Sequence, residues 1–139
     1  MSFEEWASGS RPAIRDMIGG LGGDLGAFDA DPLSAVDVLD GFIARVPWAQ
    51  FETDDWAWLH AQLVAYVAEA LIHHHGGGWK AVPDASAPDG WRPVIEIPGA
   101  GGTVREVDVA RLVHQELHPV PQRVPRLVER AVALAEATS

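Results

Sequence analysis

Histidine is the residue type in this sequence that could most directly support metal chemistry, because imidazole nitrogens are common ligands of transition metals. Three of the six histidines follow one another at positions 73–75. Glu69 precedes His73 by four residues, and His114 precedes His118 by four, so on a helix each pair would present two ligands on one face. These four residues are the metal-binding alternative that the sequence allows.

Three features argue against a metal centre. Consecutive helical residues point about 100° apart, so the three histidines of the run 73–75 cannot all converge on one ion. His114 and His118 project away from the apolar face of their segment, which predicts contact with solvent and not with a second helix. In a zinc-protease helix a glutamate directly follows the first histidine, whereas here Gln115 does. We therefore expect exposed or helix-capping histidines, and no bound metal or cofactor.

Other catalytic groups are scarce or unspecific. The chain has no cysteine, which excludes disulfides, thiolate ligands and cysteine nucleophiles. No serine lies in the glycine-flanked turn of a hydrolase, and the glycines at 19–26 match neither a dinucleotide-binding nor a phosphate-binding loop. Acidic residues are so numerous that no pair stands out for acid–base chemistry. We favour a binding role over an enzyme.

The six tryptophans favour a protein-binding role. On a helix that begins near residue 53, Trp56 falls on the apolar stripe and is expected in the core, whereas Trp58 points about 200° away from it. An indole outside the core is costly to leave in water and is common at interface hot spots. The candidate partner-binding patch comprises two indoles and three acidic residues at its rim: Trp48, Trp58, Glu52, Asp54 and Asp55. The alternative is that another segment, such as residues 1–20, covers both indoles.

The distribution of charge suggests the kind of partner. The net charge is −10 at pH 7, and the segment 24–55, with eight acidic residues and one basic residue, carries seven of those ten charges. Such a surface repels phosphate backbones and anionic lipids, which argues against nucleic acids and membranes as partners, and it attracts a basic protein. A solvated surface that promotes solubility is the other interpretation.

Length and composition predict one domain spanning residues 1–139. The N-terminus is acidic and lacks the basic flank and apolar run of a signal peptide, and no stretch reaches the roughly 18 uncharged apolar residues of a membrane helix. We expect a cytoplasmic protein.

Apolar periodicity predicts a helix-rich α+β fold. The expected helices are 32–46, 54–75, 108–118 and 125–137. Short apolar runs between glycine- and proline-rich turns predict a three-stranded antiparallel β-meander over 78–107. Pro93 indicates that the second strand lies at an edge, at least locally.

Capping residues predict where the helices begin. Ser2 favours a short opening helix or turn, and a second helix is expected to start near Pro12. Asp31, Thr53 and Asp108 are the expected N-caps of later helices.

The segment 63–129 resembles small bacterial α+β domains of unknown function, best represented in actinobacteria. The resemblance rests on a helix that ends in an Ala-Glu-x-Leu element, a Gly-Gly-x-Trp element in loosened form, a proline-containing strand and a helix that opens with aspartate. Here these elements are Ala68-Glu69-Ala70-Leu71, Gly77-Gly78-Trp79, Pro93-Val94-Ile95-Glu96-Ile97 and Asp108-Val109. The resemblance implies the order of the elements but no activity.

Two functions follow as expectations. The first is a non-enzymatic acidic module, immunity-like, antitoxin-like or an adaptor, that docks a basic protein partner. A homo-oligomer formed through the tryptophan patch would bury the same residues and would resemble binding of a partner. The second is a metal- or small-molecule-binding protein, or an enzyme, that uses the glutamate–histidine pairs.

Overall fold

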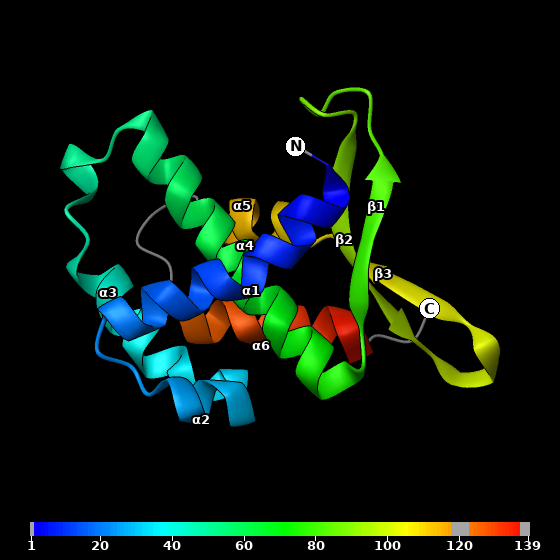
Figure 1. Ribbon diagram of the computed structural model, residues 1–139, viewed down its shortest axis with the longest axis horizontal. Helices are drawn as coiled ribbons and strands as arrows, with labels where there is room; N and C mark the ends of the chain where they lie inside the picture. The colour runs from blue at the N-terminus through cyan, green and yellow to red at the C-terminus, as the bar shows by residue number, and fades with distance from the viewer. Residues whose placement is uncertain (1, 118–122, 137–139) are drawn as a thin grey trace.

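Helix α4 (Thr53–His75) forms the centre of the molecule (Figure 1). The computed structural model describes residues 2–117 and 123–136. Every residue from Leu63 to Leu71 is buried, because α4 contacts three other helices and the sheet along this stretch. A helix that is buried on all sides needs small and apolar residues around its whole circumference, which Val64-Ala65-Tyr66-Val67-Ala68 supplies.

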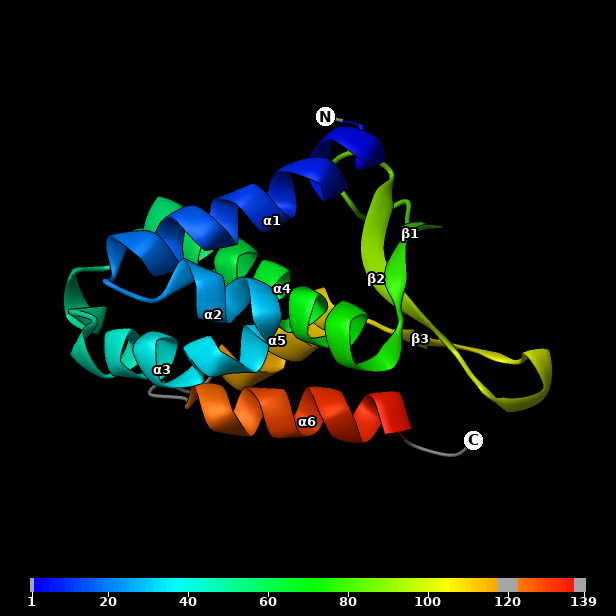
Figure 2. The same ribbon diagram turned by 60° about the horizontal axis from the view of Figure 1, so that its bottom comes forward.

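Helices α1, α5 and α6 and strand β2 pack against α4, with α1 and α6 on opposite sides of it (Figure 2). The remaining α-helices are α1 (Phe3–Gly20), α2 (Leu25–Ala30), α3 (Val36–Arg45), α5 (Val109–Leu117) and α6 (Val124–Glu136). The strands are β1 (Gly78–Pro83), β2 (Trp91–Pro98) and β3 (Val104–Val107), and three short 3-10 helices are η1 (Pro32–Ala35), η2 (Trp48–Gln50) and η3 (Ala100–Gly102). The predicted helix-rich α+β class with an antiparallel three-stranded sheet is confirmed. His118 and Ala137, the expected last residues of two helices, lie outside the described residues.

The N-terminal segment differs from the sequence prediction. Helix α1 is continuous through Pro12, so the expected separate helix starting there is wrong, although Ser2 does cap α1 through a bond from the Glu5 N–H to Ser2 Oγ at 3.2 Å. Pro12 has no N–H to donate to the carbonyl of Ser8, four residues earlier in the helix. Because Ser8 is exposed, water can bond to that carbonyl instead. Packing favours the continuous helix, because the ring of Trp6 lies edge-on to those of Trp79 and Trp91 in the sheet.

Two other local predictions need correction. Helix α4 is capped by Glu52, not by Thr53: the Glu52 side chain accepts from the Asp55 backbone, and Asp55 Oδ2 accepts from the Glu52 N–H at 2.9 Å. This reciprocal pair satisfies two free amide groups, which a threonine at the next position could not do alone. Helix α2 was not expected, and it begins where Asp24 Oδ1 accepts from the Ala27 N–H at 3.0 Å.

The sheet has the order β1-β2-β3, so β2 is the central strand. Pro93 pairs with Ala81 of β1, and β3 pairs only with the later part of β2, from Ile95 to Pro98. Pro93 therefore lies where β2 has no neighbour on its β3 side and where a missing N–H removes no bond from that ladder. Ile95 is fully buried and belongs to the same hydrophobic core as the buried residues of α4 and α5.

A buried hydrogen bond joins α4 to η1. The Tyr66 hydroxyl donates to the Pro32 carbonyl at 2.9 Å. Burial raises the pKa of Tyr66, so the phenol keeps the proton that it donates. We expect Tyr66→Phe to lower the free energy of unfolding by about 1–2 kcal/mol, because the Pro32 carbonyl loses its donor at a site closed to water.

Urea denaturation measures this loss. Ser86→Ala, which removes an exposed hydroxyl bonded to Asp84, is the control and should change stability by less than about 0.5 kcal/mol. Equal effects of the two substitutions would contradict the proposed importance of the buried bond.

Candidate functional site

Trp58 is an exposed aromatic residue near the beginning of α4. Its side chain is 45% exposed, and its ring lies edge-on to that of Phe42 in α3, with 6.1 Å between the ring centres. Asp54 and Asp55 precede it by one helical turn and are both exposed. The structure thus brings an indole, a phenyl ring and two carboxylates together on one face, and the described part of the segment 1–20, from residue 2 on, leaves the indole exposed.

Trp48 lies apart from Trp58. Its ring stacks on that of Trp56, with 5.1 Å between centres and an angle of 21°, and Phe51 packs edge-on against both. Because Trp56 and Trp58 point about 200° apart on the helix, Trp48 and Trp58 lie on different sides of α4. Glu52 precedes Trp56 by one turn and so lies nearer to Trp56 than to Trp58. The predicted patch is therefore divided between two sides of the helix.

The prediction that Trp56 belongs to the core is wrong. Trp56 is only half-buried, whereas Leu59, one turn later, is fully buried. The reason is that the first turn of α4 extends beyond the other helices, and the segment before it folds back so that Trp48 and Phe51 cover Trp56.

Internal ion pairs neutralise part of the acidic segment 24–55. Asp29 accepts bonds from Arg11 and Arg15 at 2.9–3.0 Å, and the Arg15 guanidinium holds the pKa of Asp29 below its usual value. Asp40 is buried and paired with Arg123. Within residues 2–117 and 123–136, no arginine or lysine forms an ion pair with Asp54 or Asp55. Asp54 and Asp55 thus leave uncompensated negative charge beside Trp58.

Glu69 is not positioned to act with His73. The carboxylate of Glu69 is buried, and its Oε2 accepts from Arg11 Nη1 at 3.0 Å. Burial raises the pKa of Glu69, while the Arg11 guanidinium opposes this change. The carboxylate therefore belongs to an ion-pair network with Arg11 and Asp29 that joins α4 to α1 and α2.

The structure also separates His73 from His114. The ring of His114 lies 6.4 Å from that of His60, which is thirteen residues before His73 on α4. At 1.5 Å per residue the two ends of that stretch are about 20 Å apart. His118 lies outside the described residues. Glu69, His73 and His114 thus do not form one site.

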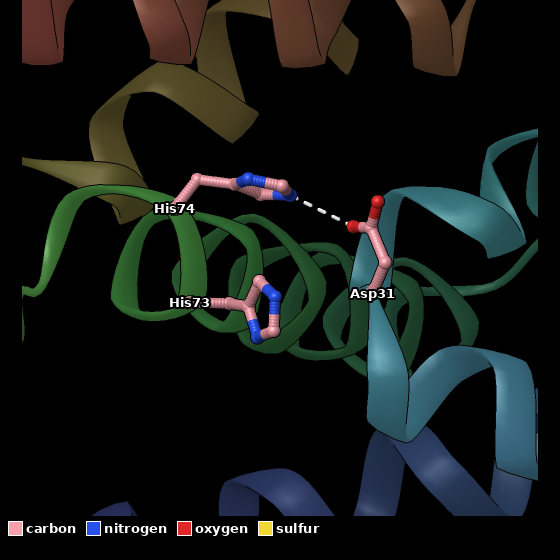
Figure 3. Close-up of side chains that lie close together, drawn as sticks. All are labelled: Asp31, His73 and His74. Carbon is pink, nitrogen blue, oxygen red and sulfur yellow. Dashed lines mark hydrogen bonds and ion pairs between the residues drawn. The ribbon is translucent and has the colours of Figure 1, made fainter.

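A different set of ligands meets at the end of α4, namely Asp31, His73 and His74 (Figure 3). His74 Nε2 lies 2.7 Å from Asp31 Oδ1, and the rings of His73 and His74 lie 4.9 Å apart at 72°. The Leu33 N–H also bonds Asp31 Oδ1 at 3.0 Å, which confirms the predicted N-cap. The hydrogen bond from His74 holds the pKa of Asp31 below its usual value.

Sequence reasoning missed Asp31 as a member of this site. Asp31 and His73 are 42 residues apart in the chain, and the local pattern Asp-Pro identified Asp31 only as a cap. Nothing in the spacing indicates that the segment before η1 returns to the last turn of α4.

Comparison with known proteins adds no assignment. No family model, curated protein or solved structure matches the chain. The resemblance to actinobacterial domains therefore stays a prediction.

Among the described residues, no helix combines the length and apolar character needed to cross a membrane.

A hollow of about 230 Å³ lies between α1 and α4. It is lined mainly by small and apolar side chains, among them Trp6, Ala13 and Ala65. The oxygens Ser10 Oγ and Gln62 Oε1 are buried there without a hydrogen-bond partner among the described residues. Such a space with two free polar atoms suits bound water molecules, which usually satisfy buried groups of this kind.

Proposed function

We propose that this protein is a non-enzymatic module that docks a basic protein through the exposed surface at the beginning of α4. This surface, the Trp58 face, consists of Phe42, Asp54, Asp55 and Trp58. The observation that carries the proposal is the 45% exposure of Trp58 beside two carboxylates that no described arginine or lysine neutralises.

The chemistry of the Trp58 face matches a cationic side chain. A guanidinium can stack on the exposed indole while it bonds a carboxylate, and both interactions strengthen when the partner excludes water. The net charge of −10 adds long-range attraction for a basic surface and speeds its approach. An immunity-like, antitoxin-like or adaptor role suits a small acidic chain of this kind, by analogy of charge and size.

The proposal predicts that Trp58→Ala weakens binding while the protein stays folded. With a purified basic partner captured from the source cells, the affinity should fall by about 30-fold, as for a hot-spot indole. The free energy of unfolding should fall by about 1–2 kcal/mol, because nearly half of the residue is already exposed. Calorimetric titration and urea denaturation of the same samples give both values.

Charge-matched variants provide the control. The pair Asp54→Asn and Asp55→Asn should weaken binding and reduce its salt dependence. The pair Glu129→Gln and Glu136→Gln removes the same charge from exposed positions on α6 and should leave the affinity within about threefold. Equal losses of affinity for the two pairs would show that the partner is attracted by net charge and not by the Trp58 face. Normal binding by Trp58→Ala would exclude the Trp58 face as the binding site.

Light scattering of the free protein must come first. A mass near 14.9 kDa is expected for a monomer. A dimer that Trp58→Ala dissociates would show that a second copy occupies the face, which would overturn the proposal of a basic partner.

A further inference from the structure

Three potential metal ligands from separate parts of the chain converge at the last turn of α4. Asp31 lies between α2 and η1, and His73 and His74 belong to α4. One ligand atom from each lies within 4.8 Å of the others. We propose that Asp31, His73 and His74 bind a divalent transition-metal ion of the Zn²⁺ type. This inference is independent of the Trp58 face.

The donor set determines which ions would bind. Two imidazole nitrogens and one carboxylate oxygen suit Zn²⁺, Co²⁺ or Ni²⁺, whereas Mg²⁺ and Ca²⁺ prefer oxygen ligands throughout. Three protein ligands leave at least one position for water or for a further group. The last turn of a helix also carries partial negative charge on its free carbonyls, which favours a cation at this place.

The geometry requires only side-chain adjustment. Ligand atoms bound to a tetrahedral ion at about 2.0–2.1 Å lie roughly 3.3 Å apart. His74 Nε2 and Asp31 Oδ1 are now 2.7 Å apart and hydrogen-bonded. This bond would break when Nε2 loses its proton to bind the ion, and the His73 ring would move inward. His73 and His74 are exposed, so their rings can turn without displacing core residues.

Asp31 can bind an ion without losing its structural role. The bond from the Leu33 N–H, which makes Asp31 a cap, uses Oδ1 and would remain. Oδ2 accepts no hydrogen bond from the described residues and is available as a ligand. Binding would fix the start of η1 to the end of α4 beside the existing bond between Tyr66 and Pro32.

Zn²⁺ titration of protein purified without a histidine tag tests the proposal. Isothermal titration at pH 7.5 should give one site per chain, Zn²⁺ should raise the melting temperature, and Mg²⁺ should not. His73→Gln, His74→Gln and Asp31→Asn should each lower the Zn²⁺ affinity at least tenfold. Asp31→Asn is the sharpest of these variants, because asparagine also caps helices and keeps the shape of the side chain.

His75→Gln is the matched control, because it removes the third histidine of the run but none of the proposed ligands. Its Zn²⁺ affinity should stay within about twofold of the unsubstituted protein, since the three ligands remain. The absorption spectrum of the Co²⁺-loaded protein should change in Asp31→Asn and stay the same in His75→Gln. Equal losses of Zn²⁺ affinity in all three histidine variants would show that adjacent histidines bind the ion unspecifically, which would contradict the proposed site. Unchanged affinity in Asp31→Asn, or no binding by the unsubstituted protein, would overturn the proposal.

Discussion

Asp40→Ala is expected to lower the free energy of unfolding by about 2–3 kcal/mol at pH 7. Asp40 is 8% exposed, and its two oxygens accept from Arg123 Nε at 2.9 Å, with a further contact to Arg123 Nη2. Asp40 Oδ1 also accepts from the Val124 N–H at 3.0 Å, so it caps the buried start of α6. Alanine would leave that N–H without a partner, whereas Arg123, whose side chain is 67% exposed, can turn to water.

The same substitution should remove part of the pH dependence of stability. The Arg123 guanidinium holds the pKa of Asp40 below its usual value, so the folded protein binds this proton less readily than the unfolded chain does. The stabilisation is complete above the unfolded pKa of about 3.9 and is lost as the pH falls through the lower folded pKa. The difference in the free energy of unfolding between Asp40→Ala and the unsubstituted protein should therefore become smaller as the pH falls.

Urea denaturation at pH 7 and at about pH 3 measures both effects, and Asp40→Asn serves as the control. Asparagine keeps an acceptor for the Val124 N–H but loses the charge, so its stability at neutral pH should lie between those of the other two proteins. A loss below about 0.5 kcal/mol in Asp40→Ala would show that the pair with Arg123 contributes little.

The elements that follow from local patterns were predictable from the sequence. Apolar residues at three- and four-residue steps located α4, and short apolar runs between glycine- and proline-rich turns located the β-meander, because both signals act over a few residues. The caps Ser2 and Asp31 were identified for the same reason. The errors at Pro12 and Thr53 arose where tertiary packing or a reciprocal cap outweighed a single-residue preference.

The candidate sites depend on contacts that no local pattern encodes. Asp40 and Arg123 are 83 residues apart, and Asp31 and His74 are 43 apart. From the sequence, Asp40 is one of the eight acidic residues of the segment 24–55 that would form a charged surface. In the folded protein Asp40 is buried. Trp58 was predictable as an outward-facing indole because helical geometry alone sets its direction relative to Trp56.

Phe28→Ala is expected to have the largest effect, a loss of about 3–4 kcal/mol in the free energy of unfolding. Phe28 is fully buried, and its ring lies 6.0 Å from the Arg11 guanidinium carbon. Helix α2 has only six residues, too few to be stable without tertiary contacts. Phe28 is its one buried residue and therefore anchors the segment that carries Asp29 and Asp31.

Hydrogen exchange and urea denaturation together test this role. The amides of α2 should lose protection before those of α4 in Phe28→Ala, because the cavity lies under α2 while the centre of α4 keeps its other contacts. Phe42→Ala removes the same side chain from a half-buried position and should cost only about 1–2 kcal/mol. Equal losses in the two variants would mean that α2 is held by its ion pairs, chiefly those of Asp29 with Arg11 and Arg15, and not by the buried ring.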